Sequence, residues 1–210
     1  MSLTEQWTLG AESIIFRFEQ WGHTYLLKHR PAKPYLLKTI DDFLRASRTS
    51  RECKMLTVAR SLGVPTPNVH WVDVTTHTIV MDLIQGKQLK QLVEEVPERR
   101  LRELCSEFGR LVGLLHRGGV VHGDPTTSNV IVDEQARMWL IDFGLAEMNA
   151  TVEMKGVDIH LMRRAFETTH WDLEEAMLKS AIEGYKGLLE KEAEDVLSRA
   201  EEIRERGRYH

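Results

Sequence analysis

The sequence predicts an α+β fold in two lobes, a small β-rich N-terminal lobe with one main helix (residues 1–84) and a reduced helical C-terminal lobe (residues 85–210). Before residue 85, short runs of alternating apolar and polar residues are separated by turn residues, a pattern typical of hairpins. After residue 97, apolar residues recur at helical spacing over long stretches. A chain of 210 residues is long enough for two small lobes.

The stretch from residue 120 to 144 carries the most specific signal. A polar loop with Asp124 and Asn129 lies between two short apolar runs, and a predicted hairpin then ends in Asp142. Because a hairpin folds the chain back on itself, we expect two carboxylates and one amide oxygen to converge on a small space.

Phosphoryl transfer from ATP needs such a set of groups. Protein kinases hold their metal ions with the Asn of the catalytic loop and the Asp of an Asp-Phe-Gly turn, and an Asp five residues before the Asn orients the acceptor hydroxyl. This pattern assigns Asn129 and Asp142 as metal ligands and Asp124 as the catalytic base. The structural alternative, a polar turn followed by an ordinary hairpin, explains each half of the stretch but not both in this order.

In the N-terminal part, strands over residues 12–18 and 24–28 form a predicted hairpin that ends in Lys28. A lysine at this position can contact the α- and β-phosphates of ATP, although a lone lysine there is more often a solvated strand end. Gly10, Ala11 and Glu12 precede the first strand, where kinases carry a glycine-rich phosphate loop. A single glycine makes that signal weak.

Residues 49–62 predict the main helix of this lobe, and Glu52 shares its apolar face. A buried carboxylate needs a cationic partner, which favours an ion pair with Lys28. The alternative is a capping box over residues 49–52, which would place Glu52 at the start of the helix. A second hairpin over residues 69–74 and 78–84 follows, and its end at Met81–Ile84 is a candidate hinge by position alone.

The C-terminal lobe contains predicted helices over residues 98–117, 172–188 and 190–206 and one that opens near Gly156. We assign no chemistry to the first. Asp158 either anchors the catalytic loop by accepting backbone N–H bonds or is an ordinary acid at a helix N-terminus. The segment after Gly144 is short and contains no Ala-Pro-Glu, so the platform that binds a peptide substrate in ordinary protein kinases is missing or comes from another protein.

Composition indicates a globular protein, with 42% hydrophobic and 29% charged residues and a net charge of −4 that argues against general polyanion binding. Two cysteines, no signal-peptide core and no bilayer-length apolar run lead us to expect a cytoplasmic protein with no membrane contact. Residues 28–60 hold nine basic and three acidic residues, either a solvated face or a surface for RNA that includes Arg45 and Arg48.

With these residues in place, the chain resembles the small kinase subunit family of the KEOPS complex, an atypical kinase family related to the RIO kinases. The resemblance covers nearly the whole chain and rests on the segments at residues 10–12, 27–30, 48–52, 122–129, 141–145, 155–158 and 206–208. The most specific parts are Thr-Thr-Ser inside the catalytic loop and Lys-Gly-Val-Asp after the short segment. Pro125 is a departure, since we expect Leu there. The length resembles archaeal members.

The resemblance implies a protein-kinase-like bilobal fold, with ATP and magnesium or manganese between the lobes and with Lys28, Glu52 and Asp124 as the catalytic set. It places ATP near Gly10, Ala11, Glu12, Ile15, Lys28, Met81, Asp82, Leu83, Ile84, Ile131 and Ile141. It also implies serine/threonine autophosphorylation and an ATPase that serves threonylcarbamoyladenosine synthesis on tRNA.

The partners implied by the resemblance are a threonylcarbamoyl transferase subunit on the C-terminal lobe and tail, a small regulatory subunit on the N-terminal lobe, and tRNA bound through the complex. The alternative function is a small-molecule phosphotransferase of the aminoglycoside or choline kinase type, which also carries His-Gly-Asp. Those enzymes need extra helices, and 210 residues leave little room. A non-catalytic scaffold has no need for Lys28, Glu52, Asp124, Asn129 and Asp142 together.

Overall fold

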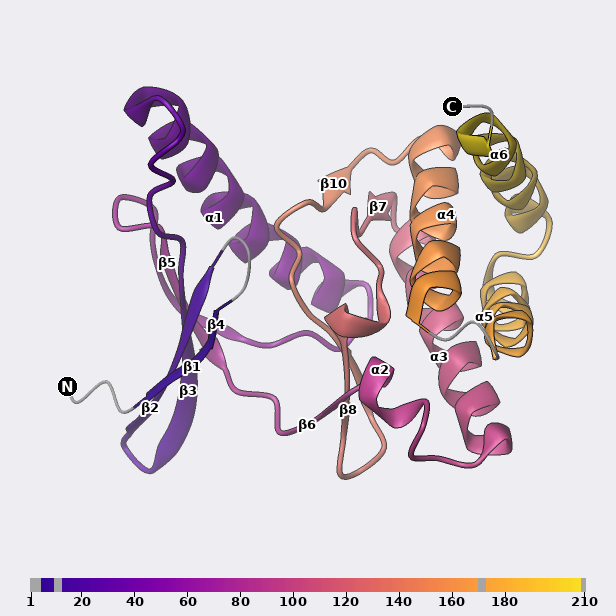
Figure 1. The fold of residues 1–210 in the computed structure, drawn as a ribbon, viewed down its shortest axis with the longest axis horizontal. Helices are drawn as coiled ribbons and strands as arrows, with labels where there is room; N and C mark the ends of the chain where they lie inside the picture. Colours follow the sequence, from indigo (N-terminus) through magenta and orange to yellow (C-terminus); the bar gives the residue numbers. More distant parts are fainter. Residues whose placement is uncertain (1–4, 10–12, 170–172, 209–210) are drawn as a thin grey trace.

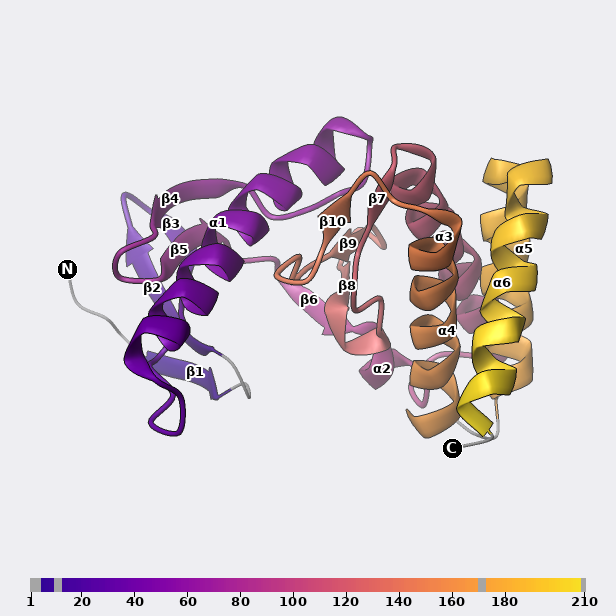
Figure 2. The ribbon, with the colours of Figure 1, turned by 90° about the horizontal axis from the view of Figure 1, so that it is seen from above.

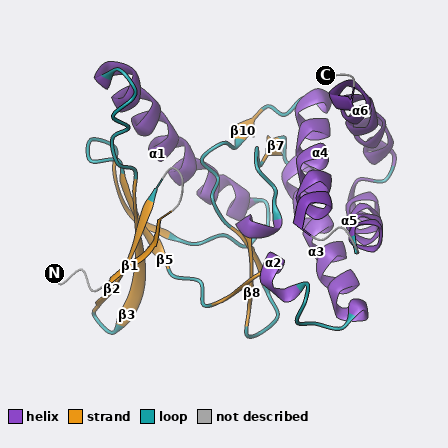
Figure 3. Cartoon of the chain, viewed as in Figure 1, coloured by secondary structure: helices purple, strands orange, loops and turns teal. Residues whose placement is uncertain are grey.

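A computed structural model describes residues 5–9, 13–169 and 173–208 of the chain. It has the predicted α+β, two-lobed architecture, with a β-sheet at one end and a group of helices at the other (Figure 1). The longer strands lie at one end of the molecule and most of the helices at the other, with short strands between them (Figure 3). The fold class is therefore confirmed, whereas the boundary at residues 84 and 85 stays a prediction.

The N-terminal sheet has five antiparallel strands in the order β1-β2-β3-β5-β4. Their bounds are β1 Glu5–Leu9, β2 Ile14–Gln20, β3 His23–His29, β4 Val69–Asp73 and β5 Thr78–Asp82. In the register of β2 and β3, Ile15 lies opposite Lys28 and Phe16 opposite Leu27. Because cross-strand partners share a face, Ile15 and Lys28 point to one side of the sheet and Phe16 and Leu27 to the other.

The long helix α1 (Lys38–Ser61) packs against β4 and β5. It begins eleven residues before the predicted start at residue 49, so the expected start was wrong. Its first turns project beyond the edge of the sheet (Figure 1), and Ile40, Phe43 and Leu44 there are exposed. These three residues recur at helical spacing, so the sequence does carry a short apolar stripe here, which the predicted start did not use.

A small three-stranded sheet in the order β6-β8-β9 lies between the sheet and the helices (Figure 2). It consists of β6 Gly86–Gln88, β8 Val130–Asp133 and β9 Met138–Leu140, with the short helix α2 Leu89–Leu92 beside it. The predicted hairpin after Asn129 is β8–β9. A second, two-stranded ladder joins β7 Val120–Val121 to β10 Glu147–Met148.

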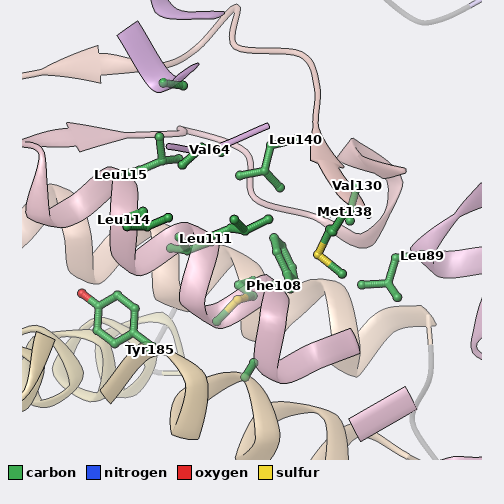
Figure 4. Packing of buried hydrophobic residues seen from close by; sticks show 14 of the residues in the cluster. Val64, Leu89, Phe108, Leu111, Leu114, Leu115, Val130, Met138, Leu140 and Tyr185 are labelled. Atoms are coloured by element: carbon green, nitrogen blue, oxygen red, sulfur yellow. The ribbon is translucent and has the colours of Figure 1, made fainter. Parts of the chain in front are cut away.

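The helical end is built around α3 (Glu98–Arg117), which packs most extensively against α5. The remaining elements are the 3₁₀ turn η1 Thr127–Asn129 and the helices α4 Val152–Thr169, α5 Glu174–Leu189 and α6 Lys191–Arg208. Glycines allow α3 and α5 to approach closely, because a Cβ on Gly109 would lie 1.8 Å from the carbonyl oxygen of Ala181. Figure 4 shows Phe108 and Leu111 of α3 between Tyr185 of α5 and the β8–β9 hairpin.

The C-terminal segment 190–206, predicted as a charged helix with a frayed end, forms α6, which packs on α4 and α5 and buries Ala193, Val196 and Ala200. Among the residues that the structure describes, no helix has both the length and the apolar character needed to cross a membrane.

Candidate active site

The catalytic loop follows β7 and is fixed by its backbone. Gly123 adopts a left-handed conformation (φ +82°), and a Cβ there would lie 2.4 Å from the carbonyl oxygen of Leu145. Only glycine fits this position without a shift of the backbone. The buried His122 ring packs on Phe143 and donates from Nε2 to the carbonyl oxygen of Ile141, which ties the loop to the end of the β8–β9 hairpin.

Asp124 and Asn129 meet as expected. The amide Nδ2 of Asn129 donates to the carboxylate Oδ2 of Asp124 at 2.8 Å and to its carbonyl oxygen at 2.9 Å. Burial raises the pKa of the Asp124 carboxyl, and the bond from Asn129 offsets this only in part. With Nδ2 engaged, the amide oxygen of Asn129 is the atom left for a cation.

The hairpin returns Asp142 to the same region. Its Oδ1 accepts a bond from Lys28 Nζ at 2.9 Å. Burial raises the pKa of the Asp142 carboxyl, but the nearby Lys28 ammonium and the hydrogen bond it donates outweigh burial, so this pKa lies below its usual value. Asp142 therefore stays ionised. Its backbone is left-handed, with φ +61°, which is uncommon for a residue with a side chain.

Lys28 also donates to Glu52 Oε1 at 2.8 Å, which confirms the predicted ion pair. Glu52 lies in the middle of α1, so the alternative capping box at residues 49–52 is wrong. Burial lowers the pKa of the Lys28 ammonium, but Glu52 and Asp142 together more than offset it and the pKa lies above the usual value. Lys28 is thus a charged group that joins β3, α1 and the turn at residues 142–144, which is predicted above to be a metal-binding turn.

Asp158 anchors the catalytic loop. Its carboxylate accepts the backbone N–H of His122 at 2.6 Å and that of Gly123 at 2.9 Å. Asp158 lies inside α4, which begins at Val152, so the alternative of an acid at a helix N-terminus is wrong.

Two buried residues that support this site, Arg30 and His116, escaped the sequence analysis. Arg30 donates to the second oxygen of Glu52 at 2.5 Å, and it looked like part of a basic run. His116, in the helix to which we assigned no chemistry, donates from Nε2 to Asp158 Oδ2 at 3.2 Å and accepts from the hydroxyl of Tyr185 at 2.8 Å. Each is a basic or polar residue at a position that faces the core. Hydrophobic periodicity alone does not predict which partner such a residue binds.

These groups border a cleft of about 530 Å³ between the sheet and the catalytic loop. The cleft is lined by the following residues that were predicted from the sequence for catalysis, ATP binding or metal binding: Ile15, Lys28, Glu52, Met81, Asp82, Leu83, Ile84, Asn129, Ile131, Ile141 and Asp142. Asp124 adjoins it through Asn129. Gly10, Ala11 and Glu12 lie outside the described residues. The carboxylate of Asp82 bonds Asn68 and His70 on the β4 side. The roles of all these residues in ATP binding stay predictions.

The donor set fits a magnesium ion. Asp142 offers an ionised carboxylate and Asn129 an amide oxygen, and magnesium prefers such oxygen ligands, usually completed by waters and substrate phosphates. Among the described residues there is no cluster of three or more His, Cys, Asp or Glu that would hold a metal without a substrate. Waters and the phosphates of a bound nucleotide would complete the ligands of a metal held here.

A larger hollow of about 860 Å³ lies on the outer face of the sheet, lined mainly by aromatic and apolar side chains such as Phe16, Tyr25 and Trp71. Among the described side chains that line it there is no carboxylate and no lysine. The chemistry therefore belongs to the smaller cleft.

Known proteins resemble the chain along its length. The family model described as "RIO domain" matches residues 37–176. The "KEOPS complex subunit Bud32" of Pyrococcus abyssi is 42% identical over 95% of this chain and 94% of its own length. A "probable serine/threonine-protein kinase BUD32 homolog" of Archaeoglobus fulgidus is 40% identical, covering 96% and 94%.

A further relative is a longer protein. The "probable bifunctional tRNA threonylcarbamoyladenosine biosynthesis protein" of Methanosarcina mazei is 39% identical over 95% of this chain, which spans only 35% of that relative. Among solved structures, the Rio2 kinase of Chaetomium thermophilum, solved with ADP and Mg²⁺ as a phosphoaspartate complex, has a TM-score of 0.65 at 18% identity, covering 97% of this chain and 70% of that one. This likeness concerns the fold.

None of these matches favours an aminoglycoside or choline kinase. The matched family, the curated relatives and the kinase-like fold agree with the geometry of the cleft. The chain is an ATP-dependent phosphotransferase that belongs to the RIO-domain kinase family, in the branch of the KEOPS kinase subunit Bud32.

Proposed function

We propose that this chain is the kinase and ATPase subunit of a KEOPS complex and that its ATP turnover supports threonylcarbamoyladenosine modification of tRNA. The observation that carries the proposal is the ion cluster of Lys28, Glu52 and Asp142 on the wall of a cleft, beside the bonded pair of Asp124 and Asn129. In kinases these five groups bind the phosphates and metal and orient the attacking oxygen.

Each side chain has a defined task in this proposal. Asp142 and Asn129 would hold magnesium, or manganese in its place, which would neutralise charge on the phosphate oxygens. Lys28 exchanges Asp142 for the α- and β-phosphates while Glu52 keeps it aligned. Asp124 orients the attacking hydroxyl or water, since its carboxylate adjoins Asn129. Burial raises the pKa of Asp124, which makes this carboxylate a better proton acceptor than a solvated one.

The segment that follows the metal-binding turn supports an ATPase role. Only seven residues separate Gly144 from the start of α4 at Val152, and β10 among them pairs with β7 next to the catalytic loop. This leaves no platform along which a peptide substrate would lie. The acceptor is then water, a hydroxyl of the chain itself or a group that a partner presents.

We infer the partners from the fused relatives and from exposed apolar surface. The bifunctional relatives join a region like this chain to a second part about twice as long, so a stand-alone chain is expected to bind that part as a separate transferase subunit. Leu145, Met148, Val152 and Val157 are exposed beside the catalytic loop and supply apolar surface for it. In the basic tail, Arg204 pairs with Glu201 and Arg206 with Glu202, which leaves the transferase contact mainly to these apolar residues.

For the small regulatory subunit we propose the aromatic hollow on the outer face of the N-terminal sheet. Trp21 is 83% exposed and Trp71 is 50% exposed there, far more than an apolar side chain is in a core.

The basic run at residues 28–60 is a weaker candidate for tRNA binding than its composition suggests, because Arg45 pairs with both Asp41 and Asp42. Reversing the charge at Arg45 and Arg48 tests it, and unchanged tRNA binding by the assembled complex would remove it. Cys53 and Cys105 are free thiols, which supports a cytoplasmic setting.

The deciding experiment measures ADP release and protein phosphorylation by the pure chain, alone and with the transferase subunit and tRNA, beside Asp124→Ala. We expect ADP release to rise with partner and tRNA while protein phosphorylation does not, and Asp124→Ala to abolish the rise. Phosphate that goes instead to a partner Ser or Thr, independently of tRNA, would leave a protein kinase and reject the tRNA role.

A further inference from the structure

Arg30 lies where a cation has no evident place in the phosphotransferase mechanism. It follows the last residue of β3, two positions after Lys28, so both side chains point to the same face of the sheet. Its backbone is fixed on both sides, since its N–H donates to the carbonyl oxygen of His77 at 3.0 Å and its carbonyl accepts from Arg45 Nη1 at 3.2 Å. The residue is only 3% exposed.

The guanidinium of Arg30 shares Glu52 with Lys28. Nη2 of Arg30 donates to Oε2 at 2.5 Å, while Nζ of Lys28 donates to Oε1 at 2.8 Å. The same Nη2 would lie 3.1 Å from a Cβ on Gly144, so the guanidinium also borders the metal-binding turn. One buried cation thus links β3, α1 and that turn, with each oxygen of Glu52 held by a different donor.

Arg30 is unfavourable as a purely structural residue. Its Nε and Nη1 are buried without a hydrogen-bond partner among the described residues. Burying unpaired donors opposes folding, and apolar residues can often replace a whole buried ion cluster with no loss of stability. The presence of an arginine with unpaired donors here therefore argues for a task that its charge performs.

We propose that Arg30 is a positioning residue that keeps Glu52 directed into the cleft while Lys28 moves from Asp142 to the phosphates of ATP. Lys28 alone cannot both hold Glu52 in place and bind the phosphates, because its ammonium group leaves Asp142 and moves during each turnover. This inference rests on the proposed roles of Lys28 and Glu52.

The contact between Arg30 and Glu52 also makes control by phosphorylation unnecessary for the Lys28–Glu52 pair. In protein kinases, phosphorylation of the activation segment controls whether the Lys–Glu ion pair is in place. Here that segment is short and Gly123 stands where many kinases have the arginine of His-Arg-Asp. Arg30 supplies a permanent cation for Glu52 from within β3, so the pair forms without phosphorylation.

A double-mutant cycle tests the inference. The variants are Arg30→Met, Glu52→Gln and the two together, and kcat and KM for magnesium ATP are measured for each. We expect Arg30→Met to lower kcat by about tenfold or more, with a smaller change in KM, because it disturbs alignment rather than binding. In the Glu52→Gln background the same substitution should lower kcat by less than about twofold, because an effect that passes through Glu52 is lost with it.

Two further variants separate positioning from folding. Arg30→Lys keeps a cation for the single bond to Oε2 and should return kcat to within about threefold of the unsubstituted chain. Arg60→Met is the matched control, since Arg60 is also on the N-terminal side, donates to the carbonyl oxygen of Thr66 at 2.5 Å and has a buried, unpartnered Nε. It should leave kcat unchanged, and melting temperatures are recorded for all variants.

The inference fails if the effects of Arg30→Met and Glu52→Gln on kcat are additive, or if Arg30→Met affects kcat no more than Arg60→Met does. Should Arg30→Met not fold, Arg30→Gln replaces it in the cycle, because it removes the charge but keeps a donor. If instead Lys28→Met and Glu52→Gln themselves leave turnover unchanged, the proposed function of the site fails, and that result is distinct from additivity.

Discussion

At the scale of single residues, charge balance organises the cleft. Lys28 and Arg30 face the carboxylates of Glu52 and Asp142. Three of these side chains are almost completely buried, whereas that of Asp142 is 47% exposed. The more accessible carboxylate is the one that a metal can take over, since removing it from Lys28 leaves the buried pair with Glu52 intact. The cluster therefore has one exchangeable member and a fixed remainder.

We expect Asp142→Asn to reduce ATP turnover by about 100-fold or more, because the neutral amide is a poor magnesium ligand. Steady-state ADP release across a magnesium titration measures the loss. Asp133→Asn is the control, because Asp133 lies on the same hairpin but bonds Trp139 Nε1 rather than the cluster. Turnover that survives in Asp142→Asn would reject Asp142 as a metal ligand.

Gly123 gives a prediction about the catalytic loop. Gly123→Ala meets both a left-handed backbone and a carbonyl oxygen 2.4 Å away, whereas Gly22→Ala meets a similar φ of +75° with open space around it. We expect Gly22→Ala to destabilise the fold by about 1 kcal/mol and Gly123→Ala by about 3 kcal/mol with loss of turnover. Urea unfolding of both variants gives the difference. Equal free energies would show that the carbonyl of Leu145 moves aside at little cost.

At the scale of elements, the local sequence pattern predicted the hairpin correctly. It did not predict features that depend on contacts between segments far apart in the chain. The β8–β9 hairpin brings Asp142 back toward Asn129 because its turn is local and its strands are apolar. The start of α1 was missed although Ile40, Phe43 and Leu44 recur at helical spacing, because the predicted helix was drawn only from the apolar face that contains Glu52. His116 was missed because its partners, Asp158 on α4 and Tyr185 on α5, are far away in the sequence.

Two buried histidines, His116 on α3 and His122 in the catalytic loop, make the stability of the fold depend on pH. His116 and His122 are completely buried, and burial lowers the pKa of both imidazoles despite the nearby Asp158. Below the unfolded pKa of about 6.5 the unfolded chain binds protons that the folded chain does not, so stability that is complete above that pH is lost as pH falls toward the folded values. Each histidine contributes a slope of about 1.4 kcal/mol per pH unit within that window.

We therefore expect the free energy of unfolding to fall between pH 7.5 and about 5.5, measured by urea titration at each pH. His116→Gln should reduce the slope because one buried imidazole is removed. His23→Gln, at the exposed start of β3, should leave the slope unchanged. A slope in His116→Gln equal to that of the unsubstituted chain would show that His116 takes up its proton without unfolding.

At the scale of the whole molecule, the two lobes share one hydrophobic core. Buried residues of α1, β5 and the chain between them join those of α3 and the β8–β9 hairpin in a single cluster. The end of α1 reaches the end of α3, where a Cβ on Gly118 would lie 2.3 Å from Leu62 Cδ1. The carbonyl oxygen of Pro65 also accepts the N–H of Leu140 at 3.0 Å. The sequence predicted two lobes from composition and periodicity, and neither observable reports such contacts across the boundary.

This shared core predicts that the chain unfolds as one unit. Separating the lobes would expose buried apolar surface on both sides, which would oppose unfolding of either lobe by itself. Urea unfolding followed by far-UV circular dichroism, which is dominated by the C-terminal helices, should therefore have the same midpoint as hydrogen exchange in peptides from β2 and β3. Residues 85–210 expressed alone should lack a cooperative transition. Two separate midpoints, together with a cooperative transition in that fragment, would instead mean that the lobes are independent domains whose cleft is free to open, and the fixed geometry around Glu52 would then need ATP to assemble it.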